Sequence, residues 1–237
     1  MTDRAVVIVG AGPTGMMLAA ELALAGVDAE VVERSAVPDL DRARAGGLHS
    51  RTIELLDQRG VADRFLEAGQ PMQIQGFAGI GLDIGDFPTR FNYGLALAQA
   101  HSERLLAAWV DELGVPVTRP LEMTGFAQDE SGVDVELSDR RSMRAEYLVG
   151  CDGGRSVIRK SAGIDFPGWE ATTSWVSAEV QMEDVPKFGV LPQGGGVGPA
   201  AGGGVALALI EGQVEHTTPP TLQDVREALH RRLWDGP

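Results

Sequence analysis

The chain has 237 residues, of which 43% are hydrophobic and 23% charged, so it can build a sizeable core without disulfides or metal ions. It carries 34 acidic and 20 basic residues, a formal net charge of −14, which disfavours nucleic acid and anionic membrane surfaces as partners. The single cysteine, Cys151, excludes a disulfide framework and a cysteine-rich metal site, and we expect no bound metal. No apolar stretch is long enough to span a bilayer, and we expect a cytoplasmic protein.

The N-terminal residues follow the order strand, glycine turn, helix, strand. Ala5 to Val9 is a short β-branched run typical of a strand buried on both faces. After the turn from Gly10 to Gly15, residues Met16 to Ala25 favour a helix, and Gly26 stands where a helix C-terminal glycine belongs. Ala29 to Glu33 predicts a second strand. This βαβ order requires a parallel sheet.

Two more helices and further strands are predicted before residue 165. Ser50 can cap a helix that runs to about Arg59, and Ser102 can cap another that runs through Leu113. The alternation of Val133 to Leu137 predicts a half-exposed strand, and Tyr147 to Gly150 predicts a buried strand that returns to the parallel sheet.

The pattern changes after about residue 165. Trp175 to Met182 and Val205 to Ile210 alternate like antiparallel strands, and the glycine-rich stretch Gly194 to Gly204 between them is interpreted as a loop. Thr221 to Leu233 predicts an amphipathic helix. We therefore expect two domains, residues 1–165 and residues 166–237, the second built on an antiparallel sheet.

The glycine turn has the spacing of a dinucleotide-binding turn. Gly10 permits a tight turn, Gly12 leaves room for a pyrophosphate to approach the backbone, and Gly15 lets the helix pack close to the strand. The helix start at Pro13 and Thr14 offers free N–H groups and the positive end of a helix dipole to phosphates.

Glu33 lies 18 residues beyond Gly15, at the end of the second predicted strand. A carboxylate there can accept hydrogen bonds from both ribose hydroxyls of an adenosine and would repel a 2′-phosphate. The turn is therefore predicted to hold a dinucleotide other than NADP.

Three segments, residues 5–34, 42–54 and 147–156, resemble the class A flavoprotein monooxygenases, the p-hydroxybenzoate hydroxylase group. The likeness is greatest to members that act on aromatic polyketides and rifamycin-like antibiotics. The resemblance implies an α/β fold: a Rossmann-like FAD-binding domain with a parallel sheet and a β-meander, followed by part of an antiparallel-sheet substrate domain.

The resemblance also implies roles for single residues. Glu33 would bind the adenosine ribose with Arg34 beside the adenine, and Arg44 would neutralise the FAD pyrophosphate. Gln99 would bond the ribityl-phosphate arm, and the backbone of Met123 would meet the adenine. Asp152 and Gly153 match a motif linked to both FAD and the nicotinamide donor. With the turn, the expected cofactor residues are Gly10, Gly12, Pro13, Thr14, Gly15, Glu33, Arg34, Arg44, Gln99, Met123, Asp152 and Gly153.

Members of this group reduce FAD with NADH or NADPH and hydroxylate a small aromatic substrate with dioxygen. The sequence leaves open which nicotinamide donor is used, which substrate is oxidised, and whether the reaction is hydroxylation or Baeyer–Villiger oxidation. No catalytic base stands out, because His49 and His101 both lie in cofactor-side segments and are interpreted as structural or surface residues.

The sequence departs from the family pattern at two places. The family's Gly-Asp motif near the flavin ribityl has no counterpart here, since Gly85-Asp86 comes too early, so the chain is expected to be C-terminally incomplete. The glycine-rich run is also richer in glycine than is usual in the family. An incomplete sheet would leave apolar surface that favours self-association into a homo-oligomer.

Two rival enzyme classes and one alternative without complete activity compete with this interpretation. A pyridine-nucleotide disulfide reductase needs a cysteine pair, and a flavin halogenase needs a Trp-x-Trp-x-Ile motif, which Trp169 and Trp175 do not form. A truncated FAD-binding remnant or partner subunit, without complete catalytic activity, stays open as the alternative function.

Overall fold

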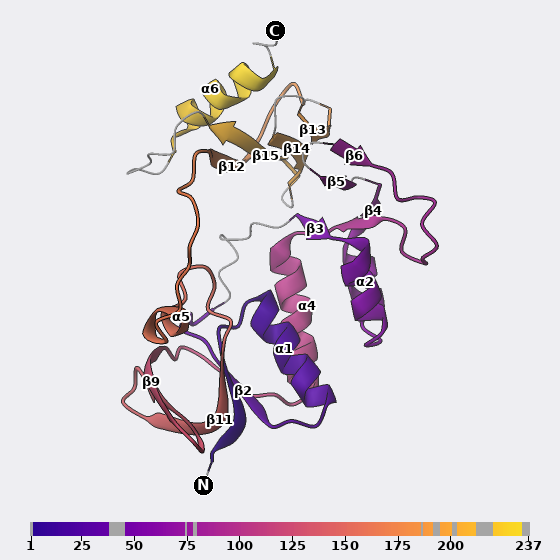
Figure 1. Cartoon of the computed structure of the whole chain (residues 1–237). Coiled ribbons are helices and arrows are strands. Elements are labelled where there is room, and N and C mark those ends of the chain that lie inside the picture. Colours follow the sequence, from indigo (N-terminus) through magenta and orange to yellow (C-terminus); the bar gives the residue numbers. More distant parts are fainter. Residues whose placement is uncertain are drawn as a thin grey trace. The chain divides into compact units, whose positions relative to one another are not determined.

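The computed structural model describes residues 2–37, 46–73, 75–77, 80–185, 187–191, 195–200, 203–211 and 220–233 (Figure 1). The chain forms two compact units. The first comprises Met1–Gln73 and Ile84–Phe166, and the second comprises Ile74–Asp83 and Pro167–Pro237. The segment 74–83, which the sequence grouped with the first domain, belongs to the second unit, and its two short strands pair with each other.

The first unit is built on a six-stranded sheet in the order β8-β2-β1-β11-β10-β9. Strands β8, β2, β1 and β11 run parallel, while β11, β10 and β9 form an antiparallel meander. The sequence prediction of a parallel sheet with a β-meander is confirmed. The strands are β1 (Arg4–Val9), β2 (Ala29–Val32), β8 (Val117–Thr118), β9 (Met123–Asp129), β10 (Gly132–Leu137) and β11 (Ser142–Gly150).

Helices α1 (Pro13–Leu24) and α4 (Gln99–Glu112) pack side by side against this sheet (Figure 1). Each helix precedes a strand of the parallel set, so both begin at the carboxyl edge of the sheet. Ile8 of β1 and Val110 of α4 are fully buried in the shared core. Three shorter helices, α2 (Ser50–Asp57), α3 (Ala62–Ala68) and α5 (Val157–Ser161), and a small sheet of β3 (Gly47–Leu48), β7 (Gly94–Ala96) and β4 (Gln70–Met72) complete the unit.

The second unit contains an antiparallel sheet in the order β12-β15-β14-β13, with α6 packed on one face. Val176 and Leu209 from the sheet are buried with Val225 and Leu229 from the helix, so the predicted amphipathic helix does cover a sheet. The elements are β5 (Gln75–Phe77), β6 (Ile80–Leu82), β12 (Ser174–Val180), β13 (Gly189–Val190), β14 (Gly195–Pro199), β15 (Val205–Glu211) and α6 (Leu222–Leu233).

Both serine caps predicted from the sequence are wrong. Helix α2 already begins at Ser50, whose hydroxyl donates to the Phe91 carbonyl oxygen instead of capping. Helix α4 begins three residues before Ser102, at Gln99, and the Ser102 hydroxyl is buried within the helix without a hydrogen-bond partner in the described chain. The N-cap residues are instead His49 for α2 and Ala98 for α4, and neither makes a side-chain capping hydrogen bond.

Two strand predictions also need correction. The glycine-rich stretch is not all loop, because Gly195–Pro199 forms β14 between β13 and β15. Gly195 has a φ of 112°, a conformation in which a side chain would be strained, so a glycine is needed at the start of this strand. Tyr147 in β11 is 66% exposed, so this strand is not buried on both faces.

Within the described residues, no helix combines the length and apolar character needed to cross a membrane.

Candidate functional site

Three of the segments predicted to bind the cofactor follow parallel strands and so meet at one edge of the sheet. The turn begins at Gly10 after β1, Glu33 follows β2, and Asp152 lies just beyond β11. Backbone bonds hold these ends in register: the Gly10 N–H donates to the Val32 carbonyl at 2.9 Å, and the Cys151 N–H donates to the Val9 carbonyl at 2.8 Å. Ligands of open α/β sheets bind at this carboxyl edge.

Two of the three turn glycines are required by the protein's own packing. Gly10 has a φ of 107°, and a Cβ there would overlap the Cys151 carbonyl oxygen. A Cβ on Gly15 would overlap the Gly10 carbonyl oxygen, which shows how closely α1 approaches the strand. Any side chain at either position would force the backbone to move.

Gly12 is different, because a Cβ there would meet no protein atom within 4 Å. Its φ of −74° and ψ of −179° are open to any residue, so neither packing nor conformation explains a glycine. Gly12 caps α1, and the first helical bond runs from the Met16 N–H to its carbonyl oxygen at 3.0 Å. The N–H groups of Thr14 and Gly15 have no acceptor in the described part of the chain. The site therefore fits a diphosphate: open space faces free donors at a helix N-terminus.

Glu33 ties the end of β2 to the glycine turn. Its Oε2 accepts from the Ala11 N–H and its Oε1 from the Ser35 N–H, both at 2.8 Å. Partial burial by itself would raise the pKa of the Glu33 carboxyl. The two backbone hydrogen bonds, with the nearby Arg119 guanidinium, outweigh burial and lower that pKa below its usual value. Each oxygen keeps capacity for a further donor such as a ribose hydroxyl.

The remaining predicted residues are spread around this edge. Arg34 is exposed next to Glu33. Gln99 is the first residue of α4 and is half-buried, and its Nε2 donates to the Glu103 carboxylate at 2.7 Å. The side chain of Met123, at the start of β9, is buried in the core on the other face of the sheet, which leaves only its backbone for a ligand. Arg44 lies outside the described residues.

Asp152 has a structural task that the sequence did not indicate. Its Oδ2 accepts from the N–H groups of Val157 at 2.6 Å and Ile158 at 3.3 Å, and so caps α5. Its Oδ1 is buried and has no hydrogen-bond partner in the described chain. Gly153 has a φ of 81°, which favours glycine in this turn.

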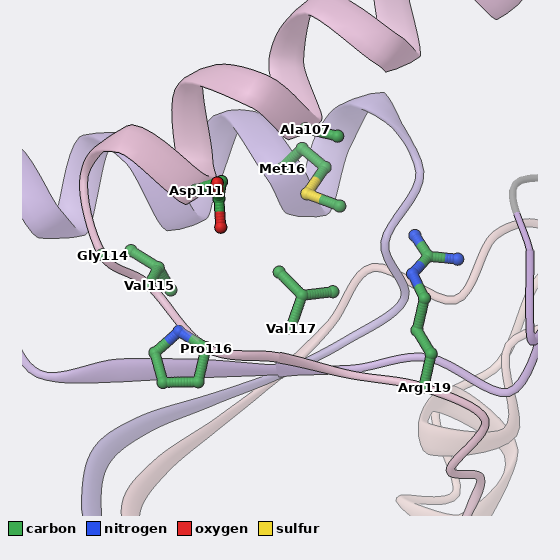
Figure 2. A pocket seen from close by; sticks show the side chains of 8 residues that line it. All are labelled: Met16, Ala107, Asp111, Gly114, Val115, Pro116, Val117 and Arg119. Carbon is green, nitrogen blue, oxygen red and sulfur yellow. The ribbon is translucent and has the colours of Figure 1, made fainter.

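A pocket of about 410 Å³ lies between α1, α4 and the segment around β8 (Figure 2). Met16, Asp111 and Arg119 line it with mainly apolar neighbours, and none of the predicted cofactor residues does so. We place the candidate site at the strand ends because the free N–H groups and the ribose-type carboxylate lie there. No group of three or more histidine, cysteine or acidic side chains in the described segments could hold a metal ion.

Comparison with known families identifies the family to which this chain belongs. A family model described as an FAD binding domain matches residues 3–196. The chain belongs to this FAD-binding family. Membership agrees with the open space at Gly12, because an FAD-binding domain must admit a diphosphate at such a turn.

Relatives of this family member include named oxygenases. The chain is 38% identical over 242 residues to a rifampicin monooxygenase of Streptomyces venezuelae, covering 94% of this chain and 49% of that protein. It is 42% identical over 199 residues to a 12-dehydrotetracycline 5-monooxygenase/anhydrotetracycline 6-monooxygenase of Streptomyces rimosus, covering 82% and 38%. The solved Diels-Alderase PyrE3 superposes with a TM-score of 0.85 at 31% identity, covering 96% and 51%. The chain thus spans between 38% and 51% of the length of these relatives.

The sequence interpretation missed Arg119. This half-buried residue follows β8 directly, and its charge acts on Glu33. No motif surrounds it, and β8 is only two residues long, so periodicity offered no signal that a fourth parallel strand ends there.

Proposed function

We propose that this chain forms the FAD-binding part of a monooxygenase that hydroxylates a phenolic, polyketide-like substrate with dioxygen and NADH or NADPH. The observation that carries the proposal is the open space in front of Gly12, at a helix start with two free N–H groups beside the Glu33 carboxylate. The names of two relatives, a rifampicin monooxygenase and a tetracycline-pathway monooxygenase, support the oxygenation chemistry and the substrate class.

In this proposal the residues at the strand ends hold the cofactor. The Thr14 and Gly15 N–H groups would bind the diphosphate. Gly10 and Pro13 would shape the turn around it, and Arg44 would neutralise its negative charge. Glu33 would accept the ribose hydroxyls beside Arg34, and the Met123 backbone would meet the adenine. Gln99, at the start of α4, would bond the ribityl-phosphate arm, and Asp152 with Gly153 would close the site after β11.

FAD, when bound, supplies the redox and oxygen-transfer chemistry, and the chain's own residues bind and orient it. A carboxylate at position 33 also favours FAD over NADP in the turn, because a 2′-phosphate would be repelled. NADH or NADPH would then act as a co-substrate that does not occupy this turn.

Matched glycine variants test the cofactor assignment. Gly12→Val should fold normally, because its side chain enters open space, but it should abolish FAD retention by occupying the diphosphate position. Gly15→Val should instead destabilise the chain, because its side chain would overlap the Gly10 carbonyl. Fluorescence titration with FAD and thermal unfolding of the flavin-free proteins give both readouts. Normal FAD affinity in Gly12→Val would refute the assignment.

The alternative, an FAD-binding chain without complete activity, predicts a different result in a turnover assay. The purified chain is mixed with FAD, NADPH or NADH, and phenolic polyketides, and the hydroxylated product per nicotinamide consumed is measured. Product in proportion to nicotinamide supports the monooxygenase. FAD binding with nicotinamide oxidation but no product supports the alternative.

A further inference from the structure

Arg119 is held beside Glu33 by the backbone on both sides. Strands β2 and β8 pair in parallel with Val32 opposite Thr118, so the next residues, Glu33 and Arg119, leave the sheet together. The Glu33 N–H donates to the Thr118 carbonyl at 3.1 Å, and the Leu121 N–H donates to the Glu33 carbonyl at 2.8 Å. Arg119 thus lies between Thr118 and Leu121, the two residues whose backbones hydrogen-bond to Glu33, so the sheet determines its position.

The Arg119 guanidinium has unused hydrogen-bonding capacity. Its single polar contact in the described chain is a long one of 3.4 Å, from Nη1 to the Ser35 carbonyl oxygen, and no described carboxylate lies within 4.0 Å. Arg64 and Arg144 differ, because they pair with Glu112 and Asp129 at 2.6–2.8 Å. A guanidinium has five N–H donors, so most of those on Arg119 remain available to a ligand.

Figure 2 shows the Arg119 side chain extending from the strand end toward α1, on the side where Met16 lies. Arg119 therefore stands between two features: the pocket under α1 and α4, and the carboxylate that accepts the ribose in our proposal. A flat, cationic group in this place can donate to ribose oxygens or purine nitrogens and can stack on a purine face.

We propose that Arg119 is a further cofactor-binding residue that contacts the adenosine half of FAD. This inference rests on the proposed FAD site. It adds a cation that binds adenosine directly, next to the carboxylate that would accept the ribose. A purely structural Arg119 would hold the Ser35 carbonyl and nothing else.

The test compares Arg119→Ala, Arg119→Lys and Arg64→Ala in the full chain. Arg64 is a matched control, since it is an arginine of the same unit that is paired with Glu112 away from the strand ends. FAD affinity is measured by fluorescence titration, and ADP, which contains adenosine but no flavin, is measured as a competitor of FAD. Removing a charged hydrogen-bond donor should weaken FAD binding by about tenfold to a hundredfold.

The inference is supported if Arg119→Ala weakens FAD and ADP by similar factors, Arg119→Lys lies between, and Arg64→Ala stays near the parent. It is overturned if Arg119→Ala binds FAD within about threefold of the parent, if ADP competes unchanged, or if Arg64→Ala weakens FAD equally. A parent chain that does not bind FAD would refute the proposed function itself, which separates the two failures.

Discussion

Glu33 shows how one side chain serves both the fold and the site. Its carboxylate accepts from Ala11 in the turn and from Ser35 after the strand, so it shapes the glycine turn before any ligand arrives. Such preorganisation lowers the entropy cost of binding, because the turn does not have to be ordered by the cofactor. Replacing Glu33 should therefore affect the stability of the flavin-free chain as well as its affinity for FAD.

The pH dependence of that stability follows from the lowered pKa of Glu33. A carboxyl whose pKa is lower in the folded chain stabilises the fold above its unfolded value of 4.5. That contribution is lost as the pH falls through the folded pKa. Glu33→Gln should thus destabilise the flavin-free chain by about 1–2 kcal/mol at pH 7, and the difference should shrink below pH 4.5.

Thermal unfolding of parent and Glu33→Gln at pH 7, 5.5 and 4 measures this difference. Glu146→Gln, at an exposed position in β11, is the control and should match the parent at every pH. A difference for Glu33→Gln that stays constant or grows as the pH falls would contradict the assignment.

At the scale of elements, α5 depends on two caps that can be separated. Asp152 accepts from the Val157 and Ile158 N–H groups, while the Ser156 hydroxyl oxygen accepts from the Arg159 N–H at 2.9 Å. Loss of such a cap costs about 0.5–2 kcal/mol, enough to speed local amide exchange severalfold. Asp152→Ala should accelerate exchange at Val157 and Ile158, and Ser156→Ala at Arg159.

Hydrogen exchange followed by NMR, with FAD titration of the same variants, distinguishes a capping role from a cofactor role at Asp152. Weaker FAD binding in Asp152→Ala but not in Ser156→Ala would indicate that the carboxylate acts on the cofactor beyond its cap. Unchanged exchange at Val157 and Ile158 in Asp152→Ala would show that the cap contributes little.

At the scale of the whole molecule, the net charge of −14 is the dominant electrostatic property. Self-repulsion of a strongly charged chain destabilises its compact state, and salt screens this repulsion over about 8–10 Å near physiological ionic strength. The exposed ion pairs, such as Arg64 with Glu112, contribute little and will not reverse the trend. The melting temperature should rise by a few degrees between about 10 and 150 mM salt.

Scanning calorimetry in NaCl and in KCl measures this rise. The same increase in both salts identifies screening as the cause, whereas an increase in only one would indicate a specific ion site. A melting temperature that falls with salt would mean that the ion pairs outweigh the net repulsion.

Local sequence features predicted the parts of the site that belong to one contiguous segment. Gly10, Gly12, Gly15 and Glu33 lie within a single βαβ unit, so spacing alone placed the turn, the helix start and the acid together. The amphipathic period of residues 221–233 predicted α6, and the strand–helix–strand order predicted the parallel sheet, whereas the meander was implied by the family resemblance. Family membership is likewise readable from these segments.

Only the tertiary structure decided the features that depend on distant partners. Arg119 was not recognised because its neighbour Glu33 is 86 residues earlier, and β8 is too short to show a pattern. Ser50 was mistaken for a cap because its hydroxyl goes to Phe91, 41 residues away. Strand β14 was missed because it is defined by its pairing with β13 and β15, which no glycine-rich window shows. Hydrogen bonds and strand pairs between remote segments form only when the chain is folded. A short sequence window contains one partner and does not show where the other will lie.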